Sequence, residues 1–207
     1  HRAFIVLWNG GRLQYRLIFS EQEESVTMLL GNQLEINEGT LFKGLKKENL
    51  TFEEVFKDII RFIEADKDSS YRISVGTDSQ VGSKTVFVSC ILVHRVGKGA
   101  IGYLHKCEMQ RPVTNLREKI YLETCASLQL AYLFDESKMK RIQEALGPNR
   151  HSEGITFEFH IDIGTKGQTK SLISEMVGMV KGLNFVPKIK PESYCASAFA
   201  DRYTKAM

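Results

Sequence analysis

The chain has 207 residues, of which 43% are hydrophobic and 26% are charged, a composition ordinary for a globular protein with one sizeable core and an appendage. The formal net charge of +3 is too small to indicate a nucleic-acid partner by itself, so the placement of charges must carry such an argument. The cysteines at positions 90, 107, 125 and 195 form no C-x-x-C pair and no cluster with histidine, which argues against a zinc site and a disulfide framework.

Residues 1–45 are expected to form an N-terminal extension to which no function is assigned. Two apolar stretches flank residues 9–11, Asn-Gly-Gly, an arrangement that favours a β-hairpin. The first apolar run, Ala3 to Trp8, is much shorter than the ~18 residues of a membrane-spanning helix, and no signal-cleavage pattern follows it. We therefore expect a cytoplasmic protein without a membrane partner.

Residues 46–207 are predicted to form one domain that opens with a packing helix at about 51–65. Thr51 and Glu54 have the spacing of a capping box, and an apolar stripe with helical periodicity follows them. Such a stripe predicts a helix that packs against the core, not a catalytic site. A polar linker, residues 66–70, then separates this helix from the first strand of the main sheet.

After the linker, the pattern predicts an α/β fold in the order βββαβαβα, with a mixed five-stranded sheet and helices on both faces. Glycine-containing turns separate the first three strands and are short enough to join antiparallel neighbours. The expected strands are residues 71–78, 85–95, 102–109, 155–163 and 185–189, and the expected helices are at about 116–134, at about 169–181 and after Pro191.

Two of the expected strands carry an aspartate on their polar face. Alternation places Asp78 on the side of its strand that carries Ser74. The same rule groups Asp162 with Glu158 and His160. Each aspartate alone fits a turn or a helix cap equally well, but a buried pair of carboxylates needs cations or hydrogen-bond donors.

The long helix contains two glutamates, Glu118 and Glu123, which helical geometry separates. At ~100° per residue, Glu123 projects within the apolar arc, whereas Glu118 points away from it. A carboxylate in the core-facing arc indicates chemistry, although an edge glutamate whose head reaches water stays open as an alternative. Glu118 fits a favourable charge in the first helical turn.

The remaining polar candidates have simpler explanations when each is taken alone. Asp201, on the last expected helix, has small neighbours that permit close approach to the sheet, but it also fits an ordinary surface charge. His160 fits a satisfied core histidine better than a proton donor. Five basic residues near the acids are candidates for phosphate contacts, although solvated side chains explain each of them more simply; they are Lys166, Lys170, Lys188, Lys190 and Arg202.

Four segments resemble the ribonuclease H-like superfamily and, within it, the poorly characterised YkuK-type family. They are GTDSQV (76–81), LREKIYLET (116–124), IDIGTKG (161–167) and IKPESYCASAFADRYTK (189–205), and the likeness covers about residues 46–207. In that superfamily, acids on the first strand, first helix, fourth strand and last helix bind two Mg²⁺ or Mn²⁺ ions. By position, the resemblance implies that Asp78, Glu123, Asp162 and Asp201 are the catalytic and metal-binding residues.

The resemblance implies a nuclease that hydrolyses phosphodiester bonds in RNA, RNA–DNA hybrid or structured DNA by a two-metal mechanism. Carboxylate oxygens are ligands that suit Mg²⁺ or Mn²⁺. A non-catalytic module that binds nucleic acid or a protein partner through the same fold is the first alternative. A nucleotide-binding enzyme is the lesser one, because residues 162–165 are similar to the first phosphate loop of actin-like and sugar-kinase ATPases. That loop joins two strands, whereas a helical pattern follows here, and the Walker spacing is absent.

Overall fold

The computed structural model describes the chain as two units, each considered by itself. The described residues are 3–9, 12–18, 34–147, 154–164, 170–183 and 185–195. The first unit, residues 1–35, contains an antiparallel hairpin of β1 (Ala3–Asn9) and β2 (Arg12–Ile18). The second unit is residues 36–207, so it begins earlier in the chain than the boundary at 46 expected from the sequence.

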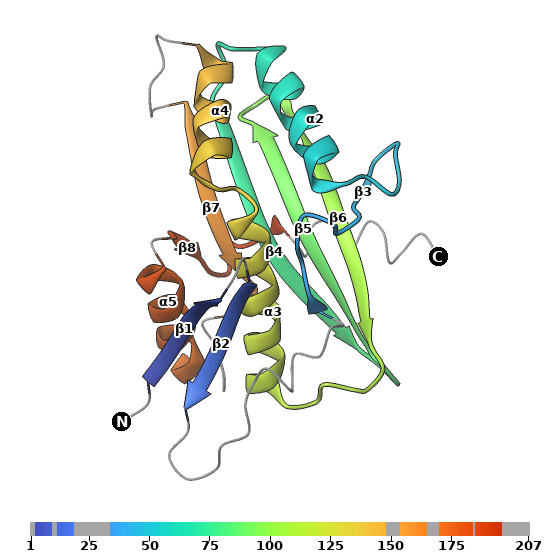
Figure 1. Ribbon diagram of the computed structural model, residues 1–207, viewed down its shortest axis with the longest axis vertical. Helices are drawn as coiled ribbons and strands as arrows, with labels where there is room; N and C mark the ends of the chain where they lie inside the picture. The colour runs from blue at the N-terminus through green and yellow to red at the C-terminus, as the bar shows by residue number, and fades with distance from the viewer. Residues whose placement is uncertain are drawn as a thin grey trace. The chain divides into compact units, whose positions relative to one another are not determined.

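A mixed sheet of six strands forms the second unit, in the order β3-β6-β5-β4-β7-β8 (Figure 1). The long strands β4, β5 and β6 form an antiparallel meander, while β7 runs parallel to β4 and β8 parallel to β7. The predicted α/β class and mixed sheet are confirmed, with β3 as an additional strand. The bounds are β3 (Lys43–Gly44), β4 (Tyr71–Val81), β5 (Thr85–Arg95), β6 (Gly99–Met109), β7 (Ile155–Ile161) and β8 (Pro187–Lys188).

Four helices of the described residues share one hydrophobic core with one face of the sheet, and Figure 1 shows α2, α3 and α4 lying over that face. The helices are α2 (Phe52–Glu64), α3 (Leu116–Tyr132), α4 (Glu136–Leu146) and α5 (Lys170–Gly182). The capping box expected at the start of α2 is present, because Thr51 Oγ1 accepts the Glu54 N–H and Glu54 Oε2 accepts the Thr51 N–H. No helix in the described part of the chain has both the length and the apolarity needed to cross a bilayer.

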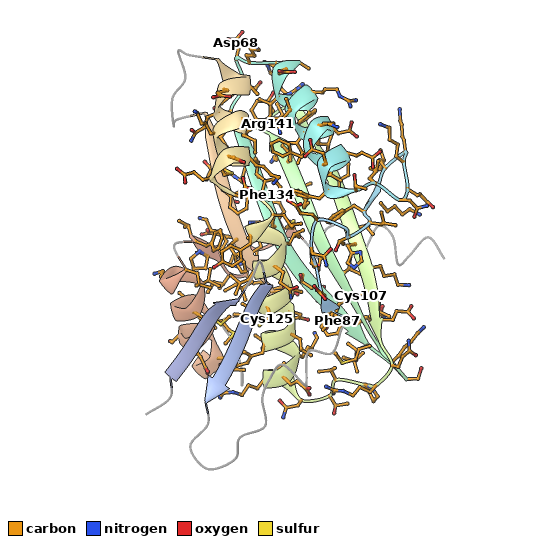
Figure 2. The ribbon with its side chains drawn as sticks, in the orientation of Figure 1. Asp68, Phe87, Cys107, Cys125, Phe134 and Arg141 are labelled. Atoms are coloured by element: carbon orange, nitrogen blue, oxygen red, sulfur yellow. The ribbon has the colours of Figure 1, made fainter. Side chains whose placement is uncertain are left out.

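Alternation along β4 and β7 decides which residues enter this core. Ile73, Val75 and Phe159 are fully buried on the helix-covered face. Phe134, labelled in Figure 2, follows α3 and makes edge-to-face contacts with Phe52 and Phe157, at ring-centroid distances of 5.2 Å and 5.4 Å. The aromatic contacts therefore tie α2 and the end of α3 to β7.

The opposite face of the sheet carries polar residues and meets the segment 191–195. Cys195 is fully buried there against Cys90 and Leu92. Its Sγ donates to the carbonyl oxygen of Ser74 on β4 at 3.3 Å. Cys195 is the last described residue, so the helix expected after Pro191 lies, with Asp201, almost wholly outside the described residues.

Candidate functional site

Asp78 and Asp162 lie where the pairing of the adjacent parallel strands β4 and β7 ends. In the β4–β7 register Thr77 is opposite Ile161, so the residue that follows each of them emerges at the same edge of the pair. The two carboxyl groups interact: the pKa of Asp78 is raised, first by burial and then by the negative charge of Asp162. The structure therefore brings together the two aspartates that strand alternation singled out.

Glu123 reaches this pair from α3 and is only 4% exposed. Its Oε1 accepts a hydrogen bond from Ser79 Oγ at 2.7 Å and lies 3.3 Å from Lys119 Nζ. Burial raises the pKa of Glu123 to about 7, opposed by Lys119 and Ser79 and assisted by the charge of Asp78. A glutamate whose head reaches water does not describe this residue.

Glu118 takes the structural role expected for it. Its backbone N–H donates to the N-cap side chain of Asn115 at 3.0 Å, and its Oε1 lies 2.5 Å from Nη2 of Arg111. Helical geometry therefore distinguished correctly between the two glutamates of α3.

Lys190 supplies positive charge to the acids. Its Nζ lies 2.7 Å from Oδ1 of Asp162. The pKa of Lys190 is raised, first by this contact and then by the charges of Asp162, Asp78 and Glu123. Asp162 Oδ1 is buried and accepts no well-aligned hydrogen bond within the described part of the chain, so the contact with Lys190 is a close ion pair.

The donor chemistry of these acids fits a hard divalent cation. Their oxygens are the ligand type that Mg²⁺ and Mn²⁺ take, and the buried Asp162 Oδ1 without an aligned donor is an atom that a cation would satisfy. Among the described residues, however, no group of three or more His, Cys, Asp or Glu side chains is arranged to hold a metal ion. Here Lys119 and Lys190 provide the positive charge.

Comparison with known proteins adds an independent observation. Residues 54–205 match the family described as Ribonuclease H-like. The chain belongs to the ribonuclease H-like family. An "Uncharacterized protein YkuK" from Bacillus subtilis (strain 168) is 42% identical over 167 residues, which cover 80% of this chain and 97% of that protein. The likeness to the YkuK-type family expected from the four segments is therefore confirmed, and no solved structure matches the chain.

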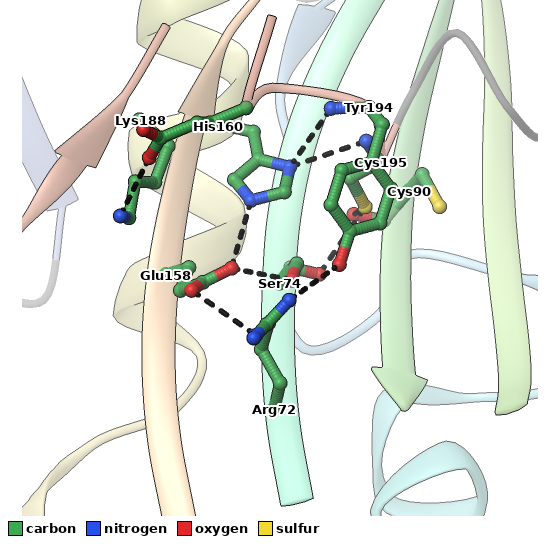
Figure 3. Close-up of polar contacts among 9 residues, drawn as sticks. Arg72, Ser74, Cys90, Glu158, His160, Lys188, Tyr194 and Cys195 are labelled. Carbon is green, nitrogen blue, oxygen red and sulfur yellow. Dashed lines mark hydrogen bonds and ion pairs between the residues drawn. The ribbon is translucent and has the colours of Figure 1, made fainter. Parts of the chain in front are cut away.

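A second polar network of this ribonuclease H-like chain lies on the sheet face that meets residues 191–195 (Figure 3). His160, 2% exposed, has its Nε2 3.1 Å from Oε2 of Glu158, and Oε1 of Glu158 lies 3.2 Å from Nε of Arg72. Nδ1 of His160 accepts the backbone N–H groups of Tyr194 at 3.3 Å and Cys195 at 3.1 Å. The network therefore satisfies both ring nitrogens, as expected for a structural histidine.

Two nucleophile-type side chains border His160, but neither is paired with it as in a hydrolase. Ser74 Oγ donates to Glu158 Oε2 at 3.4 Å, and Cys195 Sγ points to the carbonyl oxygens of Ser74 and Cys90. Burial raises the pKa of the Cys195 thiol well above its ordinary value, which keeps it protonated. The network therefore has a structural role: it holds the segment 191–195 against the sheet.

The predicted basic residues have different outcomes. Lys190 contacts Asp162, while Lys188 Nζ pairs with Oε2 of Glu192 at 2.7 Å and not with the acids. Lys166, Arg202 and the side chain of Lys170 lie outside the described residues. Sequence reasoning missed Ser79 and Lys119; the spacing of four residues between Lys119 and Glu123 was a signal that could have identified the second of these.

Proposed function

We propose that this protein is a divalent-metal-dependent nuclease that hydrolyses phosphodiester bonds in nucleic acid. The observation that carries the proposal is the meeting of Asp78 and Asp162 where the pairing of β4 and β7 ends, with the buried carboxyl group of Glu123 beside Asp78. Membership of the ribonuclease H-like family supports a nucleic-acid substrate.

Asp78, Asp162 and Glu123 would hold Mg²⁺ or Mn²⁺, with Asp201 as the fourth acid, and two ions are expected by likeness to the family. The metal would supply Lewis acidity, an activated water and stabilisation of the leaving oxygen. The chain's own groups prepare the acids for this task. Ser79 fixes the orientation of the Glu123 carboxyl group, and the charge of Lys119 favours its ionised form.

The test is cleavage of a substrate panel by wild type, Asp78→Asn and Asp162→Asn. The panel comprises single-stranded RNA, RNA–DNA hybrid and branched DNA, each with Mg²⁺, with Mn²⁺ and with a chelator. We expect metal-dependent cleavage by wild type and a loss on the order of 10²-fold or more in each variant. Lys188→Met is the matched control, because Lys188 pairs with Glu192. Equal activity in both aspartate variants and wild type would contradict the site.

A binding module without catalysis is the second candidate, and the ion pairs of Lys119 and Lys190 are the observation that favours it. The ammonium groups of these lysines balance the negative charge of Glu123 and Asp162, which a bound metal ion would otherwise balance. Its signature would be a nucleic-acid mobility shift without cleavage of any substrate on the panel.

The nucleotide-binding alternative is disfavoured because residues 162–164 follow β7 and the next described element is α5, not a second strand. Hydrolysis of ATP by wild type that is lost in Asp162→Asn would instead support the nucleotide-binding alternative.

A further inference from the structure

We propose that Lys190 is an internal counter-cation that competes with a divalent metal ion for Asp162. The inference deepens the proposed function, because it concerns how the same acids are occupied before and after metal binding. It starts from one contact, the 2.7 Å ion pair between Lys190 Nζ and Asp162 Oδ1.

The main chain holds Lys190 beside Asp162, while its side chain can move. The backbone N–H of Lys190 donates to the carbonyl oxygen of Ile163 at 3.1 Å, which fixes its Cα next to the aspartate loop. Its side chain is 47% exposed, compared with 12% for that of Asp162. The ammonium can therefore leave Asp162 for solvent by side-chain rotation, without unpacking the core.

The charges make the two occupants mutually exclusive. Asp162 Oδ1 is buried and has no aligned hydrogen bond within the described residues, so its close partner there is a cation, Lys190. An ammonium and a divalent ion in contact with the same buried oxygen would repel each other. Metal binding therefore requires Lys190 to withdraw, and that requirement weakens metal binding.

Lys119 does not share this role. Its Nζ lies 3.3 Å from Oε1 of Glu123, one turn away on the same helix, and Ser79 donates to that oxygen as well. Glu123 keeps a hydrogen bond when Lys119 is removed, whereas Asp162 Oδ1 would lose its described cationic contact when Lys190 is removed. The competition is therefore assigned to Lys190 and Asp162.

The test measures Mn²⁺ affinity by electron paramagnetic resonance of free Mn²⁺ in titrations of metal-free protein. Lys190→Met keeps an unbranched side chain, one atom shorter, without the charge, and Lys190→Arg keeps the charge. Lys188→Met is a control on the neighbouring strand β8, because Lys188 pairs with Glu192. We expect Lys190→Met to bind Mn²⁺ more tightly than wild type, on the order of tenfold, with the other two variants close to wild type.

The outcomes separate this inference from the proposed function. Tighter Mn²⁺ binding by Lys190→Met in a protein without nuclease activity supports the counter-cation and contradicts the nuclease. Unchanged or weaker binding by a folded Lys190→Met, as well as no Mn²⁺ binding by any variant, would overturn the counter-cation. Lys190→Gln provides a second neutral side chain if circular dichroism shows that Lys190→Met is misfolded.

Discussion

Nδ1 of His160 accepts the backbone N–H of Cys195 at 3.1 Å and so joins β7 to the start of the last segment of the domain. The Tyr194 N–H donates to the same nitrogen at 3.3 Å. Because Nδ1 receives both donors, Nε2 carries the ring proton and donates to Glu158. His160 is therefore a positioning residue, and it acts on the segment that leads toward Asp201.

Replacing His160 with leucine is expected to release this segment and to expose the Cys195 thiol. The substitution removes the Nδ1 acceptor of the Tyr194 and Cys195 N–H groups, and its loss at the buried Cys195 N–H costs about 1–3 kcal/mol. All four cysteines are free, and Cys195 has no solvent exposure in the folded chain. Alkylation followed by peptide mass analysis should show faster modification of Cys195 than in wild type, while Cys125 in α3 stays protected.

His160→Asn is the matched control, because its side-chain oxygen can take the place of Nδ1 as acceptor. It should restore much of the protection of Cys195, although it loses the contact with Glu158. If Cys195 reacted equally slowly in His160→Leu and wild type, the histidine would not be what holds the segment.

Gly76 permits the close approach of β4 and β7 at the level of His160. A Cβ on Gly76 would lie 3.1 Å from both the Cβ and the carbonyl oxygen of His160, its partner in the register. The strand pairing holds that oxygen in place, so we expect Gly76→Ala to lower the free energy of unfolding by about 1–3 kcal/mol. Urea denaturation measures the change.

Gly178→Ala is the control for the same chemical substitution. Gly178 lies on α5, and an added Cβ there would meet no atom within 4 Å. Alanine in a helix interior should stabilise the protein by roughly 0.5–1 kcal/mol relative to glycine. A loss of stability at Gly178 equal to that at Gly76 would show that the close approach of the strands is not the cause.

The parts of the site that sequence predicted are those that depend on local periodicity. Alternation along β4 fixes the face of Asp78, and the angular step of a helix fixes the direction of Glu123, whatever the tertiary details. Asp162 follows β7 directly and is brought beside Asp78 by the register of the two strands. The ion pair of Lys190 with Asp162 depends on where the turn after β8 brings the side chain. No short-range spacing encodes that contact.

The distinction between local periodicity and tertiary contacts also explains where the observed fold differs from the predicted one. The strand β3 has only two residues, Lys43 and Gly44, and it exists because β6 offers them an edge at Leu104 and Tyr103. The helix α4 was absent from the predicted order because its sequence is mostly polar. Its buried residues are Ile142, Ala145 and Leu146, which give a weaker periodic signal than the stripe of α2.

Asp135 caps α4 and should give the domain a specific response to acid. Its Oδ1 accepts Ser137 Oγ at 2.7 Å and the Lys138 N–H at 2.8 Å, and these bonds lower its pKa to about 2 from an ordinary 3.8. Asp135→Ala should reduce stability at neutral pH by about 0.5–2 kcal/mol. Thermal denaturation in parallel buffers measures this loss.

Asp135→Asn separates the cap from the charge, because asparagine keeps an acceptor oxygen. Since the folded-state pKa of Asp135 is lowered, the contribution of its charge is present above pH 3.8 and is lost as the pH falls through about 2. The advantage of wild type over Asp135→Asn should therefore shrink between about pH 5 and pH 2. A difference between the two proteins that is constant over this range would contradict the assignment.

Glu123→Gln and Glu118→Gln test which carboxylate of α3 serves the proposed nuclease. Glu123 is buried beside Asp78 and held by Ser79, whereas Glu118 pairs with Arg111 at the start of the helix. Glutamine preserves the size of each side chain and removes its negative charge. We expect metal-dependent cleavage to fall on the order of 10²-fold in Glu123→Gln and to change less than about twofold in Glu118→Gln.

The free energies of unfolding of the two glutamine variants decide how their cleavage rates are interpreted. Neutralising a buried carboxyl group removes the cost of desolvating its charge, so Glu123→Gln should not be less stable than wild type at pH values where Glu123 is ionised. A lower rate in a protein of undiminished stability would then place the requirement at the carboxylate itself. Equal losses of rate in Glu118→Gln and Glu123→Gln would instead assign the effect to α3 as a whole and remove Glu123 from the proposed set of ligands.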